Sequence, residues 1–246
     1  LLAGDRQSAS RLRDRVTALS GRTTIQPQVR TIHSFSRALV ERFVSDPGGE
    51  PRLLTAPEQE FRIRELLAGA GPGVWPETLR RAYSTGGFAR QVRGALARAR
   101  QLGMDPEQLV ALGEQAGEPS WAALGRFFDE YLDVLDAEQV IDYAELIHRA
   151  RVLVSDPEIA DEVGRWFGGI WLDEVAEMDP AQLALVRAVA TDDLPVIGLA
   201  DPDSAIFRFR GAHPRAAAEF VRLFGAEVVT LTESFRMPAA VADALA

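Results

Sequence analysis

The sequence contains no cysteine, few aromatic residues and no long apolar run. The absence of cysteine excludes disulfides, thiolate zinc sites, iron–sulfur clusters and cysteine nucleophiles from these 246 residues, and it is typical of a cytoplasmic protein. No apolar stretch approaches the roughly 18–20 residues that a membrane-spanning helix needs, so we expect no membrane partner. The composition, 47% hydrophobic and 26% charged, is that of an ordinary globular protein.

Lysine is absent as well, because all 27 basic residues are arginines. A Walker A loop places a lysine on the nucleotide phosphates, so the chain contains no standard Walker A loop. The net charge of −9 gives no global sign of nucleic-acid binding, although a groove that holds a single strand needs only local positive charge. The chain opens on Leu1 and Leu2 without an initiator methionine and stops within a helical pattern. We therefore expect it to be a fragment.

Two kinds of pattern divide the chain. Short apolar strands alternate with helices in residues 1–44 and 163–246, which predicts an α/β fold with a parallel sheet covered by helices on both faces. The strands are expected at 29–32, 168–174, 194–203 and 226–236, and Ser34 is expected to cap a helix that runs through Phe43. Residues 45–162 show only helical patterns separated by glycine and proline. This segment is predicted to be an all-helical insertion.

The apolar strand around Trp171 ends on two acids, Asp173 and Glu174. An aspartate at the end of a buried strand can hold Mg²⁺ through its water shell, and an adjacent glutamate can deprotonate a water for attack on a γ-phosphate. From this tetrad alone, two acids that cap the next helix are the more common explanation.

The segment ADPDSAIFRFRGA carries two aromatics and two arginines at alternating positions. Phe207 and Phe209 could stack on single-stranded bases, while Arg208 and Arg210 could meet phosphates or acids. An amphipathic edge strand or core aromatics would explain the same spacing about equally well.

Two further patterns are weaker. The three histidines lie far apart in the sequence and have no cysteine beside them, so a metal site of their own is not expected. Four arginines recur at helical spacing, and a solvated helix face is favoured there over a surface that binds duplex DNA; they are Arg90, Arg93, Arg98 and Arg100.

Six elements of the chain resemble motifs of the UvrD/Rep-type superfamily 1 DNA helicases, and they occur in the family's order over nearly the whole sequence. WLDEVAEMDPAQ resembles motif II (VDEFQDTNPAQ), and about thirty residues later DPDSAIFRFRGA resembles motif III (GDPDQSIYRFRGA). The others are RLRDRV at 11–16, similar to the EMRERI after motif Ia; TIHSF at 31–35, similar to TFHSF; DYAEL at 142–146, similar to DFDDL; and LTESFR at 231–236, similar to motif IV.

The resemblance implies a RecA-like parallel sheet with helices on both faces, called subdomain 1A, interrupted by a helical subdomain called 1B. Subdomain 1A would comprise residues 1–44, without the Walker A strand and loop, and residues 163–246. Subdomain 1B would comprise residues 45–162.

The resemblance also implies a nucleotide site for ATP and Mg²⁺. In this site Asp173 coordinates Mg²⁺ and Glu174 is the catalytic base. Arg236 contacts the γ-phosphate, and Phe235 stacks on adenine in place of the family's tyrosine. Arg210 links the nucleotide to the DNA.

A DNA site is implied at the same time. Thr31 and His33 would contact the DNA backbone. Phe207 and Phe209 would stack on bases of the translocated strand.

Several positions depart from the family pattern. Motif II continues with Ala176 and Glu177 instead of Gln and Asp, and the motif III glutamine that senses the γ-phosphate is Ser204. Loss of a polar group that acts only on the transition state typically costs about 10²–10³ in rate. A slow motor is therefore compatible with the sequence, and the drift resembles one subunit of an AdnAB-like recombination helicase.

We therefore expect part of an ATP-dependent DNA helicase, an ATP hydrolase that translocates 3′ to 5′ on single-stranded DNA in DNA repair or recombination. This chain alone is predicted to be inactive. The alternative is a catalytically degenerate, non-hydrolysing DNA-binding or scaffold subunit of a helicase–nuclease complex. Single- or double-stranded DNA is the expected partner, together with a second motor or nuclease subunit.

Overall fold

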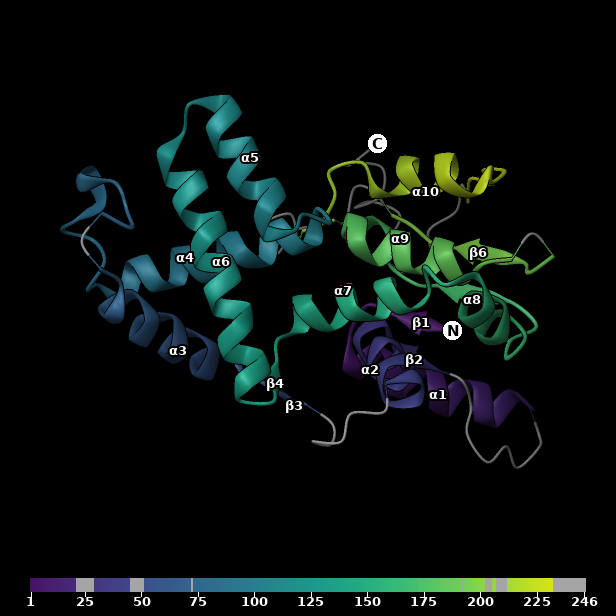
Figure 1. The fold of residues 1–246 in the computed structure, drawn as a ribbon. Coiled ribbons are helices and arrows are strands. Elements are labelled where there is room, and N and C mark those ends of the chain that lie inside the picture. Colours follow the sequence, from purple (N-terminus) through teal and green to yellow (C-terminus); the bar gives the residue numbers. More distant parts are fainter. Residues whose placement is uncertain are drawn as a thin grey trace, which may run out of the picture.

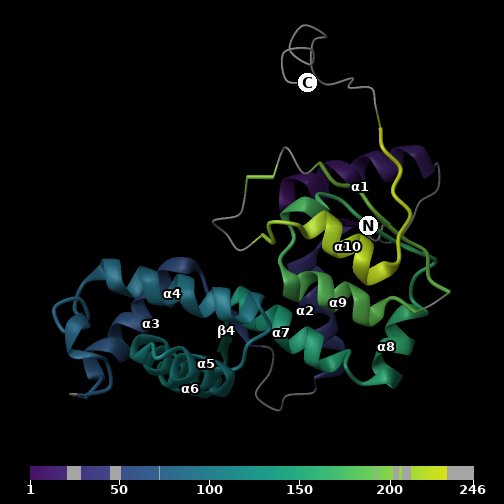
Figure 2. The same cartoon turned by 90° about the horizontal axis from the view of Figure 1, so that it is seen from above.

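The computed structural model describes residues 1–20, 29–44, 51–71, 73–191, 193–201, 205–206 and 212–231. Figures 1 and 2 show an α/β part, which contains the N-terminus, and an elongated helical part that extends from it. Residues 1–44 and 143–231 contribute the elements of the α/β part, and residues 52–141 contribute those of the helical part.

A parallel sheet lies at the centre of the α/β part. Its strand order is β2-β1-β5-β6, and all three pairings are parallel. The strands are short: β1 is Leu2–Ala3, β2 is Arg30–Thr31, β5 is Ile170–Leu172 and β6 is Val196–Gly198. The predicted parallel α/β fold is thereby confirmed, and three of the four predicted strands lie where the sequence placed them.

Helices flank both faces of this sheet. One face packs against α2 (Ile32–Phe43), α7 (Tyr143–Leu153), α9 (Pro180–Val189) and α10 (Ala216–Phe224), and their apolar side chains form one buried cluster with Ile170 and Leu172. The other face carries α1 (Arg6–Ser20), which packs on Ala3 through Ala9. Trp171 and Ile197, which pair across β5 and β6, stay about half exposed on this second face.

The helical part has a core of its own. It contains α3 (Ala56–Gly69), α4 (Gly86–Gln101), α5 (Pro106–Ala116) and α6 (Pro119–Ala137), with a short 3-10 turn at Glu77–Leu79. Trp75, Phe127 and Tyr131 lie at the centre of its buried cluster. Two short strands, β3 (Arg52–Leu53) and β4 (Val140–Ile141), pair in parallel where the chain enters and leaves this part. Sequence patterns did not predict them, because two residues give no alternation to detect.

Helices α7 and α8 (Pro157–Gly164) belong by packing to the α/β part. Leu146, Ile147 and Val163 are buried in the same cluster as the sheet, and α7 contacts α2 and α9. The predicted boundaries at 44/45 and 162/163 stay a prediction, and this packing supports drawing the second boundary near residue 141.

The arginine row of α4 differs from its prediction. Arg100 is only 6% exposed, and its guanidinium donates to Glu145 Oε2 at 2.7 Å and to Asp105 Oδ1 at 2.6 Å. It also lies over the Phe128 ring, 4.7 Å from the centroid. The expectation of a solvated face was wrong for this residue, because α4 turns that side toward α7. Arg90 stays exposed and makes only a loose pair with Glu60.

Two local predictions need correction. Helix α2 begins at Ile32, three residues earlier than a Ser34 cap predicts, because its N-cap is Thr31, which accepts a hydrogen bond from the Ser34 N–H at 3.2 Å. Residues 226–231 form no strand, and Val228 and Val229 are exposed. A strand needs a neighbour for its backbone groups, and no described strand pairs with this stretch.

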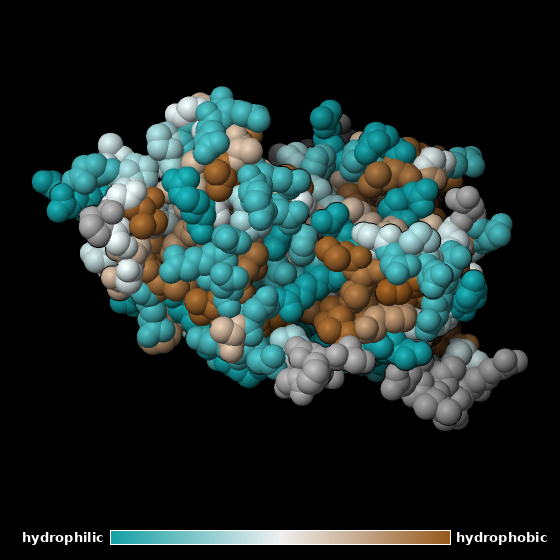
Figure 3. Space-filling model, in the orientation of Figure 1, coloured by the Kyte–Doolittle hydropathy of each residue, from teal (hydrophilic) through white to brown (hydrophobic). Residues whose placement is uncertain are grey.

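Hydrophilic side chains dominate the helical part in Figure 3, whereas hydrophobic ones gather over the α/β part around α7 and α8. Trp166 contributes to the exposed apolar surface, and its ring stacks on Phe43 at 5.8 Å. Within the described ranges, no helix combines the length and the apolar character needed to cross a membrane.

Candidate nucleotide edge and nucleic-acid groove

The carboxyl ends of the parallel strands meet at one edge of the sheet. The Asp173 N–H donates to the Leu2 carbonyl at 2.8 Å, and the Val175 N–H donates to the Leu199 carbonyl at 2.9 Å. These bonds hold the loops after β1, β5 and β6 side by side. Ligands of open α/β sheets bind at this edge, so both candidate sites are expected there.

Asp173 and Glu174 follow β5 directly at this edge. Asp173 is partly buried and Glu174 is exposed. Glu174 has a left-handed backbone (φ 57°, ψ 43°), a conformation that costs a non-glycine residue about 1–3 kcal/mol and is enriched at functional sites. Gly4, at the end of β1, lies against it: a Cβ there would be 3.4 Å from the Glu174 Cβ. The turn therefore presents the Glu174 carboxylate at the mouth of the edge.

Glu174 is the N-cap residue of a short 3-10 turn, Val175–Glu177, but its side chain makes no capping hydrogen bond, and neither acid caps α9, the α-helix that follows. Asp179 does, because its Oδ1 accepts from the Gln182 N–H at 2.9 Å in a capping box. Burial raises the pKa of the Asp179 carboxyl to about 6. The explanation that the acidic pair caps the next α-helix is thereby excluded.

The residues at this edge fit a magnesium ion that arrives with a nucleotide. The described residues gather no group of three or more His, Asp or Glu side chains that could hold a metal by themselves. Mg²⁺ in ATPases is held by one or two carboxylates, waters and the substrate phosphates, so a single aspartate at a strand end suffices. Asp173 is the side chain in that position.

Glu177 connects the motif II turn to the motif III segment. The Ile206 N–H donates to Glu177 Oε1 at 2.7 Å. Ile206 directly precedes Phe207, one of the predicted DNA-stacking residues. A carboxylate at this position thus fixes the backbone next to the predicted stacking segment.

A basic groove lies at the same edge of the sheet, beside β1 and β2. Its volume is about 570 Å³, which is within the usual range of ligand sites, about 300–1,000 Å³. Four arginines line it, Arg6, Arg13, Arg30 and Arg37, against one lining carboxylate, Asp5. The Asp5 carboxylate caps α1 by accepting from the Ser8 N–H. Four positive charges against one negative make the groove basic in a chain whose net charge is −9.

Thr31 and His33, the two predicted contacts to the DNA backbone, both line this groove. The Thr31 oxygen accepts the capping bond of α2, and a hydroxyl that accepts can still donate its hydrogen to a phosphate. Burial, together with the nearby Arg6 charge, lowers the pKa of His33 to about 4. His33 is therefore neutral near pH 7, and the positive charge of the groove comes from its arginines.

Sequence reasoning missed five lining residues: the four arginines and Tyr143. They come from α1, β2, α2 and the start of α7, so no local pattern collects them. Tyr143 lies in the DYAEL element, whose Asp142 caps α7. The helicase-like elements gave the one available sequence signal. RLRDRV contains Arg13, DYAEL contains Tyr143, and TIHSF directly follows Arg30.

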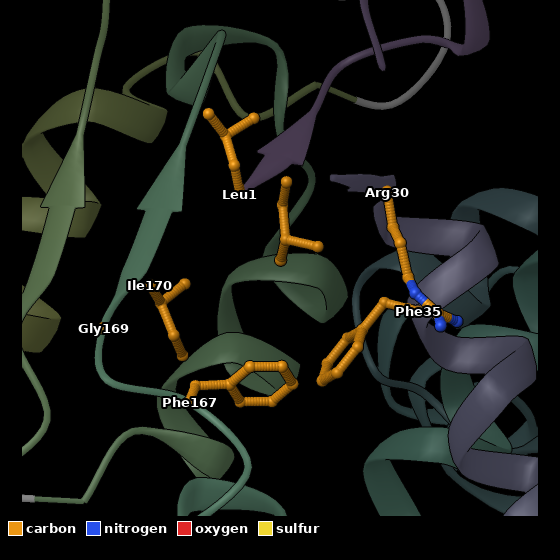
Figure 4. Close-up of a pocket in the computed structure, with 7 residues that line it drawn as sticks. Leu1, Arg30, Phe35, Phe167, Gly169 and Ile170 are labelled. Atoms are coloured by element: carbon orange, nitrogen blue, oxygen red, sulfur yellow. The ribbon is translucent and has the colours of Figure 1, made fainter. Parts of the chain in front are cut away.

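A second, apolar cavity lies at the opposite, amino end of the strands. Figure 4 shows Phe35 and Phe167 directed toward one another near Leu1 and Ile170. Its volume of about 30 Å³ leaves room for roughly one or two water molecules. We regard it as a packing gap.

Five predicted site residues lie outside the described residues: Phe207, Phe209, Arg210, Phe235 and Arg236. Their roles at the DNA and the nucleotide therefore stay predictions. The structure brings together Asp173 and Glu174 at one half of the sheet edge and Thr31 and His33 at the other.

The chain is similar in sequence to known DNA helicases. The chain is 24% identical over 236 residues to DNA helicase II of Escherichia coli strain K12, covering 94% of this chain and 31% of that protein. It is 26% identical over 247 residues to the ATP-dependent DNA helicase UvrD1 of Mycobacterium tuberculosis strain H37Rv, covering 94% of this chain and 30% of that protein. UvrD2 of Mycobacterium tuberculosis strain CDC 1551 is 27% identical over 166 residues, 63% of this chain and 23% of that protein.

The chain thus spans about a third of the length of the first two relatives. Residues 2–224 match the model of the UvrD/REP helicase N-terminal domain. This match covers nearly the whole chain, in agreement with the motif order and the parallel α/β fold. The chain belongs to the UvrD/REP helicase N-terminal domain family.

Proposed function

We propose that this chain is the N-terminal motor part of an ATP-dependent DNA helicase that moves on single-stranded DNA. One observation carries the proposal: the acidic pair Asp173–Glu174 and the four-arginine groove share one edge of the sheet. In a DNA motor, the site that hydrolyses the nucleotide must be coupled to the site that binds the DNA. Adjoining loops at one edge of the sheet provide that coupling.

The nucleotide half rests on this chain's own carboxylates. We propose that Asp173 holds Mg²⁺, which when bound neutralises charge on the nucleotide phosphates. Glu174 would accept a proton from the attacking water and so raise its nucleophilicity. Glu174 is exposed, and its side chain makes no capping hydrogen bond to the 3-10 turn that follows it, which supports a chemical role. Phe235, Arg236 and Arg210 complete the proposed ATP site.

The groove half rests on charge. Guanidinium groups on a narrow groove displace counterions from a nucleic-acid backbone and give sequence-independent affinity. Three of the four, Arg6, Arg13 and Arg37, are exposed, and of these Arg13 and Arg37 come from different helices. Arg13 donates to the Val29 carbonyl at 3.0 Å, and Arg37 pairs with Glu41 one turn along α2. These partners hold both side chains on the wall of the groove.

The test is a titration of a labelled oligo(dT) with the purified protein at several salt concentrations. Arg13→Ala and Arg37→Ala should each weaken binding and flatten the dependence of log K on log salt by about 0.7, the usual slope for one phosphate contact on a single strand. Arg165→Ala is the matched control, because that side chain is exposed at the C-cap of α8 and lines no part of the groove.

Absence of oligo(dT) binding by the unaltered protein would refute the proposal. An equal effect of all three substitutions would refute the location of the groove, because only two of them lie in it.

We further propose a role in DNA repair or recombination and a cytoplasmic location, as the sequence predicted. A second motor or nuclease subunit and the AdnAB-like assignment stay predictions. The non-hydrolysing alternative gains no support, because Asp173 and Glu174 are both present and the side chain that caps α9 is that of Asp179.

A further inference from the structure

The turn that follows Glu174 is bonded to both ends of the connection between β6 and α10. The Val175 N–H donates to the Leu199 carbonyl at 2.9 Å, and the His213 N–H donates to the Met178 carbonyl at 3.0 Å. Leu199 directly follows β6, and His213 lies three residues before α10. Two backbone bonds therefore fix the start and the end of this connection on one turn.

A side chain of the same turn holds the connection between these two ends. The Ile206 N–H donates to Glu177 Oε1 at 2.7 Å. Ile206 lies seven residues after Leu199 and seven residues before His213. Its side chain is 68% exposed, so little packing of its own fixes this residue. The position of Ile206 therefore depends on the hydrogen bond to the Glu177 carboxylate.

The turn itself is firmly built and begins at the proposed catalytic base. Val175 and Ala176 are buried, and the Glu177 N–H donates to the Glu174 carbonyl at 2.9 Å. Glu174 is the left-handed residue at the start of this 3-10 turn. A displacement of Ile206 would therefore reach the backbone of Glu174 through one side chain and one closed turn.

The connection begins at the carboxyl end of β6, at the edge of the sheet where ligands of open α/β folds bind. Phe207 and Phe209, which the family resemblance predicts to stack on single-stranded DNA, follow Ile206 in the sequence. A strand bound by them would act on the chain directly beside Ile206. The hydrogen bond from Ile206 to Glu177 thus lies between the predicted strand contacts and the proposed base.

We propose that Glu177 is a positioning residue that couples DNA binding to ATP hydrolysis. It acts through Glu174, because it holds the connection between β6 and α10 on the turn that begins at this base. The inference rests on the proposed function and specifies how the two halves of the sheet edge communicate. The aspartate of the family's motif II is one methylene shorter than Glu177, so the reach of this carboxylate is a property of this chain.

The test measures ATP turnover by the intact protein as a function of oligo(dT) concentration. Glu177→Ala removes the acceptor and should lower the maximal DNA-stimulated rate about 10- to 100-fold, within the range usual for coupling between two sites. The rate without DNA should stay close to that of the unaltered protein, because the backbone bonds of Val175 and Met178 keep the turn folded. The half-maximal oligo(dT) concentration should also stay close, because the arginines of the groove are unchanged.

Two conservative variants separate the reach of the side chain from its charge. Glu177→Gln keeps an oxygen acceptor at the same distance and should retain most of the stimulation. Glu177→Asp keeps the charge on a shorter side chain and should behave like Glu177→Ala, and it repeats the test if Glu177→Ala lowers the melting temperature. Glu219→Ala is the matched control and should change neither rate. Glu219 lies on α10, which packs against the same turn, and its carboxylate pairs with Arg222 of its own helix.

Three results would overturn the inference: an unchanged maximal rate in Glu177→Ala, equal losses of the rates with and without DNA, or a loss in Glu177→Gln as large as in Glu177→Ala. If one of these occurs while Glu174→Gln abolishes DNA-stimulated turnover, this inference fails and the proposed function stands. If the unaltered protein shows no DNA-stimulated turnover, both fail.

Discussion

Substitution of Arg100 by methionine tests how the helical part is joined to the α/β part. The Arg100 guanidinium connects α4 to Glu145 of α7 at 2.7 Å and to Asp105 at 2.6 Å, and it donates to the Met104 carbonyl at 3.3 Å. Methionine keeps most of the apolar stem over Phe128 and removes the charge. Among the described residues, Glu145 would then keep only Arg149 as an ionic partner, at 3.2 Å.

The magnitude follows from burial. Arg100 and Glu145 have side chains only 6% and 7% exposed, and removal of one partner from a buried pair typically costs about 3–5 kcal/mol. Because Arg149 remains beside Glu145 and the Asp105 side chain is 44% exposed, we expect the lower end, about 3 kcal/mol. For a chain of this size that corresponds to a fall in melting temperature of roughly 6–12 °C.

The assay is thermal and urea unfolding of Arg100→Met beside Arg90→Met. Arg90 lies on the same helix, but its pair with Glu60 is 3.4 Å long and its side chain is 61% exposed, so its loss should cost less than about 1 kcal/mol. A double variant, Arg100→Met with Glu145→Met, should lose less than the sum of its two single variants, because the pair is coupled. If Arg100→Met is no more destabilising than Arg90→Met, the reasoning is refuted.

Three further outcomes are expected. Thr31→Val should lower the free energy of unfolding by about 1 kcal/mol, the usual worth of an N-cap, whereas Thr31→Ser should not; equal losses in an unfolding titration would refute the cap. His33 and His148 have pKa values lowered to about 4 by burial, so the unfolded chain binds more protons between about pH 6.5 and 4. The free energy of unfolding should therefore fall as the pH drops across that window. A variant with both histidines replaced by glutamine should show a smaller fall. An unchanged dependence on pH in that variant would contradict the lowered histidine pKa values. Glu177→Ala should increase hydrogen exchange at the Ile206 amide while Glu177→Gln largely retains its protection; unchanged exchange in Glu177→Ala would show that the bond is absent.

Local pattern was sufficient for the fold and for the acidic pair. The apolar run around Trp171 predicted β5 because a buried parallel strand reads as continuous hydrophobic sequence, and the acids after it lie at the carboxyl edge as expected. Residues 226–231 have the same apolar character and form no strand. The difference is that a strand forms only where a neighbouring strand can accept its backbone hydrogen bonds, and the sequence of the segment itself does not show whether such a neighbour is present.

The groove could not be predicted in the same way. Arg6, Arg37 and Tyr143 meet there only because the sheet and three helices bring positions more than a hundred residues apart into contact. The helical spacing of the arginines on α4 also led to a wrong prediction for Arg100. Its local sequence does not show that Glu145, from a different helix, lies beside it and buries it. The resemblance to helicase motifs supplied what local physics could not, by identifying Thr31 and His33 as members of one site.

The most direct measurement concerns Glu174 in the intact protein. ATP turnover is measured with and without oligo(dT) for the unaltered protein and for Glu174→Gln, and nucleotide affinity is measured alongside with a fluorescent ATP analogue. The substitution removes the proposed base and keeps the size of the side chain at the left-handed turn. The account predicts DNA-stimulated hydrolysis that falls by about 10²-fold or more in Glu174→Gln, with nucleotide affinity nearly unchanged. Turnover by Glu174→Gln equal to that of the unaltered protein, or an equal loss of nucleotide affinity, would contradict it.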